Sequence, residues 1–324
     1  MSLLDLTLPG LTVVPGGLAA ARVEGLVLST GHLASVPSRA FEGMAASLTA
    51  LGLPGNLLAR APVEVSWYRR SPPQALAPLL RLARLDLSGN LLPGLPCLPA
   101  LPALQFLNLK ANRISRLPAG ALASLPRLTS LRLGVNSLTL TAILHSDLQH
   151  LSHLSSLDLS SNRLAGPLSP PSLDLFPPNL RSLDLSLNTI TSLASRTFSS
   201  LTSLTSLSLE GNLVEEVQGE AFQGLTSLTS LDLSHNSILT LATSSLAGLP
   251  SLTTLNLAHN HLQVVDSSMV APSSPLLASL LLMDNDITTV VGLALEQATH
   301  LEELDLTGES RDYFMACLWP VVAL

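Results

Sequence analysis

Aromatic and charged residues are scarce in this chain of 324 residues. Only 3% of the residues are aromatic and 12% are charged, whereas 47% are hydrophobic. A chain with so much apolar and so little charged character is not intrinsically disordered, because disorder needs the opposite balance. The shortage of aromatic side chains predicts a core that is almost wholly aliphatic.

Basic clusters and long apolar runs are also missing. The formal net charge is −7, and Arg69-Arg70 is the one place where basic residues are adjacent within a polar stretch. We expect no nucleic-acid partner, because nucleic-acid binding leaves a basic footprint. No uninterrupted apolar run is long enough to cross a bilayer, so no membrane span is expected. The first residues lack the basic region and apolar core of a signal peptide.

The residue patterns of catalytic and metal sites are absent. The two cysteines, Cys97 and Cys317, are far apart and lack metal-ligand spacing. Nothing marks a nucleophile elbow, an HExxH pair or a phosphate loop. We therefore expect no enzyme, no catalytic residue, no metal and no cofactor. A metal or pH-sensitive role for His235, His259 and Asp284 is the alternative, but histidine is an ordinary filling of that position.

One phrase recurs along the chain, Leu-x-Leu-x-x-Asn-x-Leu or Ile. The asparagines of four successive copies, the first at Asn188 and the last at Asn260, are each 24 residues apart. A fixed period of this size predicts a solenoid, in which each unit buries its apolar side only by stacking on its neighbours. Ten units keep the asparagine and three further units keep only the leucines, which makes 13 units.

Each part of the phrase has a physical role. The alternation in Leu231-Asp232-Leu233 predicts a short strand with both leucines on one face and the aspartate on the other. Stacked units place such strands in a parallel sheet. The turn after each strand leaves backbone groups in an apolar interior, and a buried asparagine amide satisfies them. We expect a structural ladder of Asn90, Asn112, Asn136, Asn162, Asn188, Asn212, Asn236, Asn260 and Asn285, with Asn56 at the same position in an earlier unit.

The residues between the strand leucines predict a column of polar side chains facing away from the core. The column before it is mostly small hydroxyl residues, so the face is mildly acidic and rich in hydroxyls. The candidate binding residues of this column are Asp86, Asn108, Arg132, Asp158, Asp184, Asp232 and Asn256. The structural alternative is that Leu-Asp-Leu-Ser is ordinary repeat sequence and that the aspartates serve solubility only.

A second apolar column follows in each unit and completes a known pattern. Phe41, Phe198 and Phe222 occupy it, and leucines take their place elsewhere. The sequence resembles the leucine-rich repeat family, in its 24-residue subtype. The resemblance implies an α/β repeat solenoid, a horseshoe with a concave parallel β-sheet and a mostly irregular or short-helical convex side.

The units predict one solenoid domain at 1–309, followed by a non-repeat C-terminal tail at 310–324. The tail is apolar and aromatic, unlike a capping repeat. Either it forms a non-standard cap or the chain is a fragment, and we favour the fragment. Uncapped ends predict self-association.

One interval between successive asparagines of the repeat is longer than the others. Asn56 and Asn90 are 34 residues apart, ten more than the period of 24, which places an insertion around 60–78. It holds Trp67, Tyr68, Arg69 and Arg70, residue types that are enriched at binding hot spots. These four are candidate binding residues. A plain surface loop, or an error at an exon boundary, is the alternative and the favoured interpretation.

The resemblance implies a non-enzymatic protein-binding module of the recognition, adhesion or receptor type, with a protein ligand on its concave face. It looks like part of an animal extracellular protein such as a chaoptin-like, Toll-type or acid-labile-subunit-like one, which predicts an extracellular or cell-surface location. The sequence shows neither cysteine-rich caps nor Asn-x-Ser/Thr glycosylation acceptors, so these two features do not support that location. The alternatives are a truncated structural fragment without independent function and a cytoplasmic scaffold or adaptor.

Overall fold

The computed structural model describes most of the chain. The described residues are 2–15, 18, 22–58, 75–95, 98–144, 146, 148–170, 176–242, 244–266, 274–291 and 299–308. They fall into two compact units, residues 1–163 and 164–324. Each unit is described by itself.

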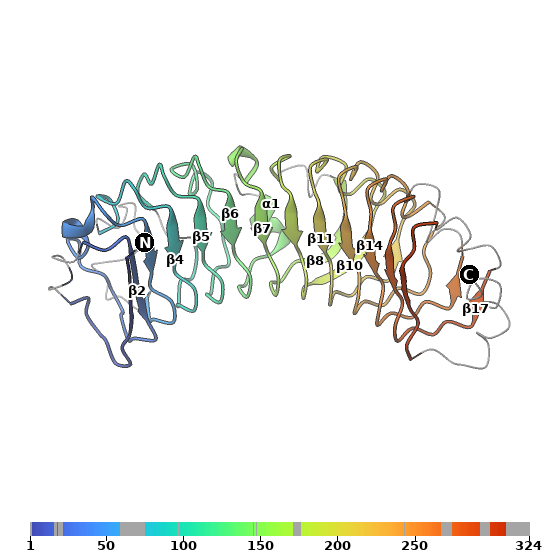
Figure 1. Cartoon of the computed structure of the whole chain (residues 1–324), viewed down its shortest axis with the longest axis horizontal. Helices are drawn as coiled ribbons and strands as arrows, with labels where there is room; N and C mark the ends of the chain where they lie inside the picture. The colour runs from blue at the N-terminus through green and yellow to red at the C-terminus, as the bar shows by residue number, and fades with distance from the viewer. Residues whose placement is uncertain are drawn as a thin grey trace. The chain divides into compact units, whose positions relative to one another are not determined.

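The first unit contains a sheet of seven short parallel strands, paired in chain order. Each strand comes from one coil of the chain, and the strands lie side by side (Figure 1). They are β1 (Leu3–Thr7), β2 (Gly25–Ser29), β3 (Ala50–Gly52), β4 (Arg84–Asp86), β5 (Phe106–Asn108), β6 (Ser130–Arg132) and β7 (Ser156–Asp158).

The second unit repeats this arrangement with six strands. They are β9 (Ser182–Asp184), β11 (Ser206–Ser208), β13 (Ser230–Asp232), β14 (Thr254–Asn256), β16 (Ser279–Leu281) and β18 (Glu303–Asp305). All 13 predicted strands are therefore present. The predicted fold, a parallel sheet with stacked coils forming a solenoid, is confirmed.

The apolar core lies behind the strands. Leu85 and Leu231, at the centres of β4 and β13, are fully buried, while the residues on either side of them are partly or wholly exposed. The second apolar column is buried as well: Phe41, Phe198 and Phe222 have no exposed surface, and the last two rings stack with centroids 5.8 Å apart. These three aromatic side chains thus fill the core.

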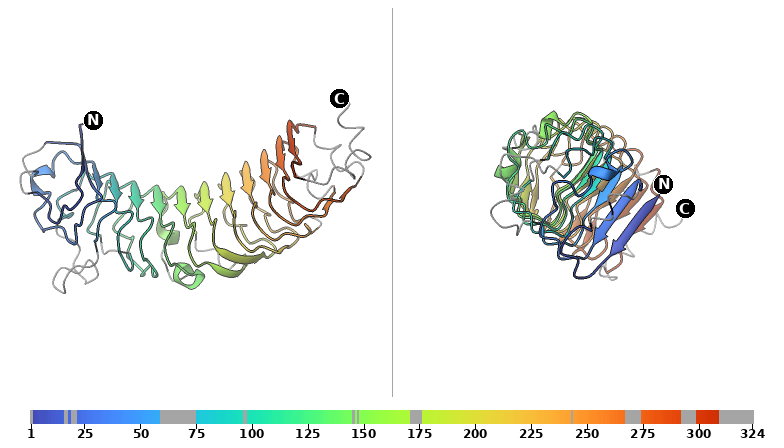
Figure 2. Two further views of the ribbon diagram at one scale, coloured as in Figure 1. Left: turned by 90° about the horizontal axis from the view of Figure 1, so that it is seen from below. Right: turned by 90° about the vertical axis from the view of Figure 1, so that its left-hand side faces the viewer.

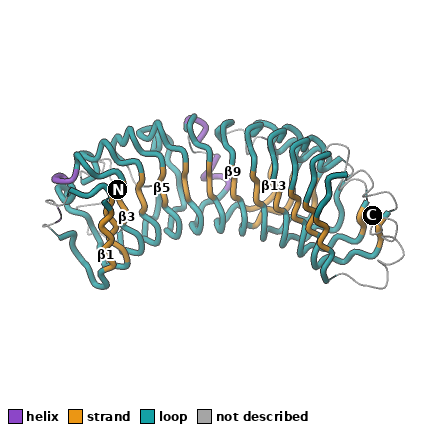
Figure 3. The backbone as a smooth tube through the Cα atoms, viewed as in Figure 1, coloured by secondary structure: helices purple, strands orange, loops and turns teal. Residues whose placement is uncertain are grey.

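The return segments of the coils are only partly as the resemblance implies. In the described residues the helices are short, among them α1 (Leu140–Leu144) and the 3-10 turns η2 (Glu42–Met44) and η3 (Leu148–His150), and loops predominate (Figure 3). The second unit also has short strands on its return segments. β8 (Ala165–Leu168), β10 (Thr189–Leu193) and β12 (Glu216–Val217) form one parallel sheet, and β15 (Val264–Val265) pairs with β17 (Thr289–Val290).

The turn after each strand has one recurring backbone conformation. The residue before the asparagine position lies in the left-handed region, with φ of 53° at His235 and 55° at His259. Glycine takes this position at Gly55, Gly89 and Gly211, because it carries no Cβ penalty there. This turn directs the next residue, the asparagine, into the core.

Candidate functional site

The asparagines join neighbouring coils from inside the turns. Asn90 Nδ2 donates to the carbonyl oxygen of Leu53 in the preceding coil (2.9 Å) and of Leu87 in its own coil (3.0 Å), and Asn90 Oδ1 accepts from Leu58 N (3.1 Å). The same three bonds are made by Asn56, Asn112, Asn136, Asn162, Asn212, Asn236, Asn260 and Asn285. Asn188 donates to Leu185 O and accepts from Leu164 N.

The sheet face opposite the core, here called the open face, carries the candidate binding residues in register. In the first unit Asp86, Asn108, Arg132 and Asp158 are successive strand partners. In the second unit Asp184, Ser208, Asp232 and Asn256 are successive partners. The two sets lie in separate units, and within each unit the register gives a column with one residue per coil. Figure 2 shows the strands that carry them side by side.

The aspartates of this column stabilise the turns that follow their strands. Asp232 Oδ1 accepts from the backbone N–H of Ser234 (2.9 Å) and from its hydroxyl (2.6 Å). Asp86, Asp158, Asp184 and Asp305 make the same pair of bonds with the residue two positions on. A role in solubility alone is therefore not sufficient to explain these residues. Their carboxylates are held in place, which gives the open face a fixed polar surface.

Asp305 shows the electrostatic effect of this bonding. The hydroxyl of Thr307, and then its backbone N–H, donate to the carboxylate and hold the pKa of Asp305 below its ordinary value of 3.8. Hydrogen bonds that favour the charged form lower the pKa of a carboxyl group.

An aromatic and cationic cluster lies on the open face of the first unit. Arg84 on β4 and Arg132 on β6 both stack on the ring of Phe106 on β5, with their Cζ atoms 4.5 Å and 5.2 Å from its centroid. Both arginines are exposed and the phenylalanine is half-buried. Of the three, Arg132 is among the sequence-predicted site residues.

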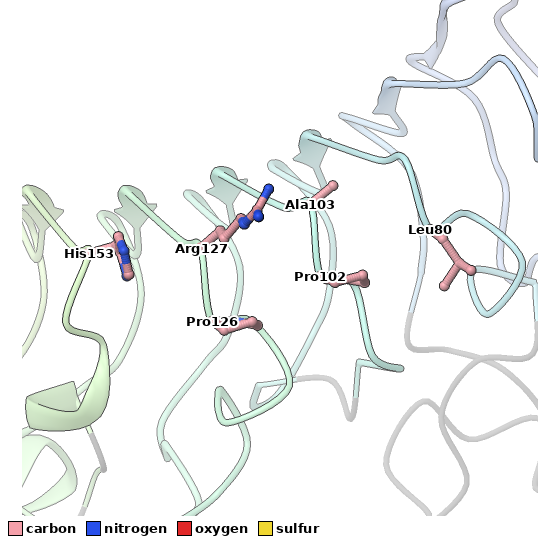
Figure 4. Close-up of a pocket in the computed structure, with 6 residues that line it drawn as sticks. All are labelled: Leu80, Pro102, Ala103, Pro126, Arg127 and His153. Carbon is pink, nitrogen blue, oxygen red and sulfur yellow. The ribbon is translucent and has the colours of Figure 1, made fainter.

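The same unit has a shallow hollow beside the strands, of about 600 Å³. Its lining comes from the turns that precede β4 to β7, one turn per coil, as Figure 4 shows. The lining residues are Leu80, Pro102, Ala103, Pro126, Arg127 and His153.

In the second unit the open face has a smaller depression of about 240 Å³, in which His235 and His259 lie. The two imidazole rings stack with centroids 4.1 Å apart, and His259 Nδ1 is 3.3 Å from Asp284 Oδ2. The three residues are thus brought together as the sequence spacing predicts. Within the described ranges, however, no group of three or more His, Cys, Asp or Glu side chains is placed to hold a metal ion.

A second ladder, of hydroxyl groups, is not among the sequence predictions. Thr205, Thr229 and Thr253 each donate from the side chain to the backbone carbonyl one coil earlier, at Arg181, Thr205 and Thr229, over 2.8 to 2.9 Å. Thr129 and Ser155 do the same in the first unit. The sequence does contain a signal for this ladder, because a serine or threonine recurs just before the strand. This position is next to the column of small hydroxyl residues described from the sequence.

Some candidates lie outside the described residues. These are Trp67, Tyr68, Arg69 and Arg70 of the insertion, both cysteines, and the tail at 310–324. Their roles remain sequence predictions, as does the extent of the domain at 1–309. No helix in the described part of the chain has the length and apolar character needed to span a membrane.

The stacked coils, the parallel strands and the inward asparagines define the class of protein as a repeat solenoid. A family model described as "Leucine rich repeat" matches residues 102–164, 174–214 and 202–262. Over these residues the chain consists of leucine-rich repeats.

A similar protein is consistent with this repeat class. Podocan of Mus musculus is 33% identical over 159 residues, which are 49% of this chain. The matched part amounts to 24% of that protein, so the chain spans about a quarter of its relative's length.

Solved structures of the same fold show lower identity. A leucine-rich repeat protein of Leptospira interrogans is 23% identical, covers 98% of this chain and 81% of its own, and has a TM-score of 0.71. The structure of the Toll–Spatzle complex of Drosophila is 18% identical, covers 92% of this chain and 41% of that one, and has a TM-score of 0.65.

Proposed function

We propose that this protein is a non-enzymatic protein-binding module that presents its open face to a protein partner. The observation that carries the proposal is the column of in-register polar residues whose carboxylates are fixed by their own turns. A surface that is already ordered loses little entropy when a partner binds it. The asparagine ladder inside the turns and the hydroxyl ladder before the strands join successive coils.

The comparisons support the same function in general terms. The Toll structure is a complex with Spatzle, so a similar fold holds a protein ligand there. We further propose that the parent protein acts outside the cell or at its surface, as a recognition, adhesion or receptor-type component. The resemblance to receptor and Toll-type ectodomains supports this location.

Site-specific photo-cross-linking tests the proposal. A benzoylphenylalanine is placed on the open face, at Ser130 or Ser206, or on a return segment, at Arg116 or Glu215. All four variants are exposed to the same preparation of cell-surface and secreted proteins. We expect a discrete cross-linked product from the open-face positions and none from the return segments. Equal labelling from both sets, or no product from the open face, would overturn the proposal.

A further inference from the structure

Arg84, Phe106 and Arg132 form a preorganised cationic cluster on the open face. The guanidinium groups stack on one ring from two neighbouring strands. Such stacking restrains arginine side chains, and it leaves the N–H groups at the edge of the guanidinium plane able to donate. Phenylalanine and arginine are both enriched in protein interfaces.

The carboxylates near this cluster are already engaged. Asp86 Oδ1 accepts from Ser88, and Asp86 Oδ2 accepts from Asn108 Nδ2 over 3.0 Å. Asp158 Oδ1 accepts from Ser160. In the described part of the chain, no carboxylate lies within ion-pair distance of Arg84, Lys110 or Arg132.

The local charge is opposite to that of the whole chain. The sequence has a formal net charge of −7, yet β4 to β6 and the turns after them carry Arg84, Lys110 and Arg132 against one aspartate, Asp86. The next aspartate of the column, Asp158, lies on β7. Charge complementarity at an interface steers the encounter and selects the partner. A cationic patch without carboxylate partners of its own fits an anionic ligand.

The turns before the strands that carry the patch hold an apolar surface. Leu80, Pro102 and Pro126 line the hollow in the turns that lead into these strands (Figure 4). Leu80 is 57% exposed, and Arg127 adds a further positive charge at the hollow. An apolar side chain of a ligand would cover Leu80 while a neighbouring acidic side chain reaches the arginines.

We propose that this surface, Arg84, Phe106 and Arg132 with the hollow lined by Leu80, Pro102 and Pro126, binds an acidic segment of a protein partner. Aspartate or glutamate side chains pair with the two guanidinium groups, and an adjacent apolar side chain occupies the hollow. The inference rests on the proposed protein-binding function and specifies the chemistry of the partner.

Fluorescence anisotropy with synthetic peptides tests this. The probe is a fluorescein-labelled decapeptide of alternating glutamate and leucine, and the matched peptides carry glutamine or lysine instead of glutamate. The full chain should bind the glutamate peptide in preference to both. Arg84→Gln and Arg132→Gln should each weaken binding about three- to five-fold, and together about tenfold. Raising the salt concentration should weaken binding further, because exposed charges are screened.

Two further variants act as controls. Arg113→Gln makes the same charge change on an exposed arginine away from the cluster, and it should leave the affinity unchanged. Phe106→Leu keeps an apolar side chain but removes the ring, and it should weaken binding about two- to three-fold. The thermal melting temperature of each variant shows whether a loss comes from unfolding.

Several outcomes would overturn the inference. Equal affinity for the glutamine peptide, or an equal loss of affinity in Arg113→Gln, would show that the cluster does not recognise carboxylates. Tighter binding of heparin or of oligodeoxythymidylate than of the acidic peptide would assign a different class of partner. If the acidic peptide does not bind while open-face cross-links persist, this inference fails and the proposed function stands. If the cross-links are missing as well, both fail.

Discussion

Each asparagine of the ladder bonds to backbone groups in two coils at once. Asn212 Nδ2 donates to Leu185 O and Leu209 O, and Asn212 Oδ1 accepts from Ile190 N. The side chain is buried, so water cannot replace it. The identity of the residue matters because a side-chain amide carries two N–H donors and a carbonyl acceptor in one group.

Asn212→Leu is expected to lower the free energy of unfolding by about 1–3 kcal/mol, because buried backbone groups lose their partners. Urea denaturation followed by circular dichroism measures the change. Asn256→Leu is the matched control: Asn256 makes one bond to its own turn, and leucine already occupies the same column at Leu281. A loss in the control as large as that in Asn212→Leu would contradict this account.

The carboxyl group of Asp305 should titrate below its ordinary pKa, because Thr307 donates to the charged form. Since the folded-state pKa is depressed, the stabilisation is present above the unfolded value of 3.8 and is lost as the pH falls through the folded pKa. Thr307→Val removes the side-chain hydrogen bond, which lowers the pKa of Asp305 most, and should raise that pKa towards 3.8. A carbon-detected NMR titration follows it, and an unchanged pKa in the variant would exclude this cause.

At the scale of the element, a strand such as β14 is held from both of its ends. The asparagine follows the strand and joins the coils from within, whereas the threonine precedes it and bonds to the preceding coil from the surface. Thr253 is an example, with its hydroxyl 2.9 Å from Thr229 O. Strands of three residues make few backbone bonds of their own, so these side chains supply part of the cohesion between coils.

Thr253→Val should cost about 0.5–1.5 kcal/mol of stability, the usual net contribution of one hydrogen bond. Thermal unfolding monitored by calorimetry or circular dichroism detects the change. Thr254→Val, at the next residue, makes the same substitution at a half-buried threonine on the open face. It should have little effect, and an equal effect at both positions would mean that the hydroxyl bond is not the cause.

The strands, their register and the core are predictable from sequence because leucine repeats with the coil. Leu85, Leu107 and Leu131 fix the centre of each strand and align Asp86 with Asn108 and Arg132. The return segments are less predictable, since β10 and β12 pair through residues such as Ser192 and Glu216 that follow no apolar alternation. α1 lies in a 26-residue interval, where two extra residues give room for a turn begun by Thr139.

The candidate site could likewise be predicted from the sequence only in part. The column position predicts which residues share the open face, so Asn108 and Arg132 are identified. That Arg84 stacks on Phe106 depends on side-chain geometry between strands, which a single sequence does not specify. The bonds from the aspartates to residues two positions on were likewise not predicted, although a serine or threonine recurs at that spacing.

At the scale of the whole molecule, stability is distributed along the coils. Each coil contacts mainly the coil before and the coil after it, so stability in a repeat protein sums over neighbouring units. A defect in one place should therefore loosen the nearby coils rather than the entire chain.

Leu107→Ala and Leu231→Ala test this in the two units. Both leucines are fully buried at strand centres, and removing either should cost about 2–5 kcal/mol locally. Hydrogen exchange followed by mass spectrometry should show faster exchange in the coils around the altered leucine and little change in the other unit. A uniform loss of protection through both units would indicate a single cooperative structure instead.

The direction of the ladder bonds has a mechanical consequence. Asn236 bonds backwards to Leu209 and Asn260 to Leu233, so the bonds that join these coils run along the stack. A tension applied to the two ends of such a stack loads the joints one after another, as in peeling, instead of shearing them together. Each coil that detaches releases about 24 residues, or roughly 80 Å of extended chain. A stack of this kind would lengthen under load in equal steps and act as a graded extensible element.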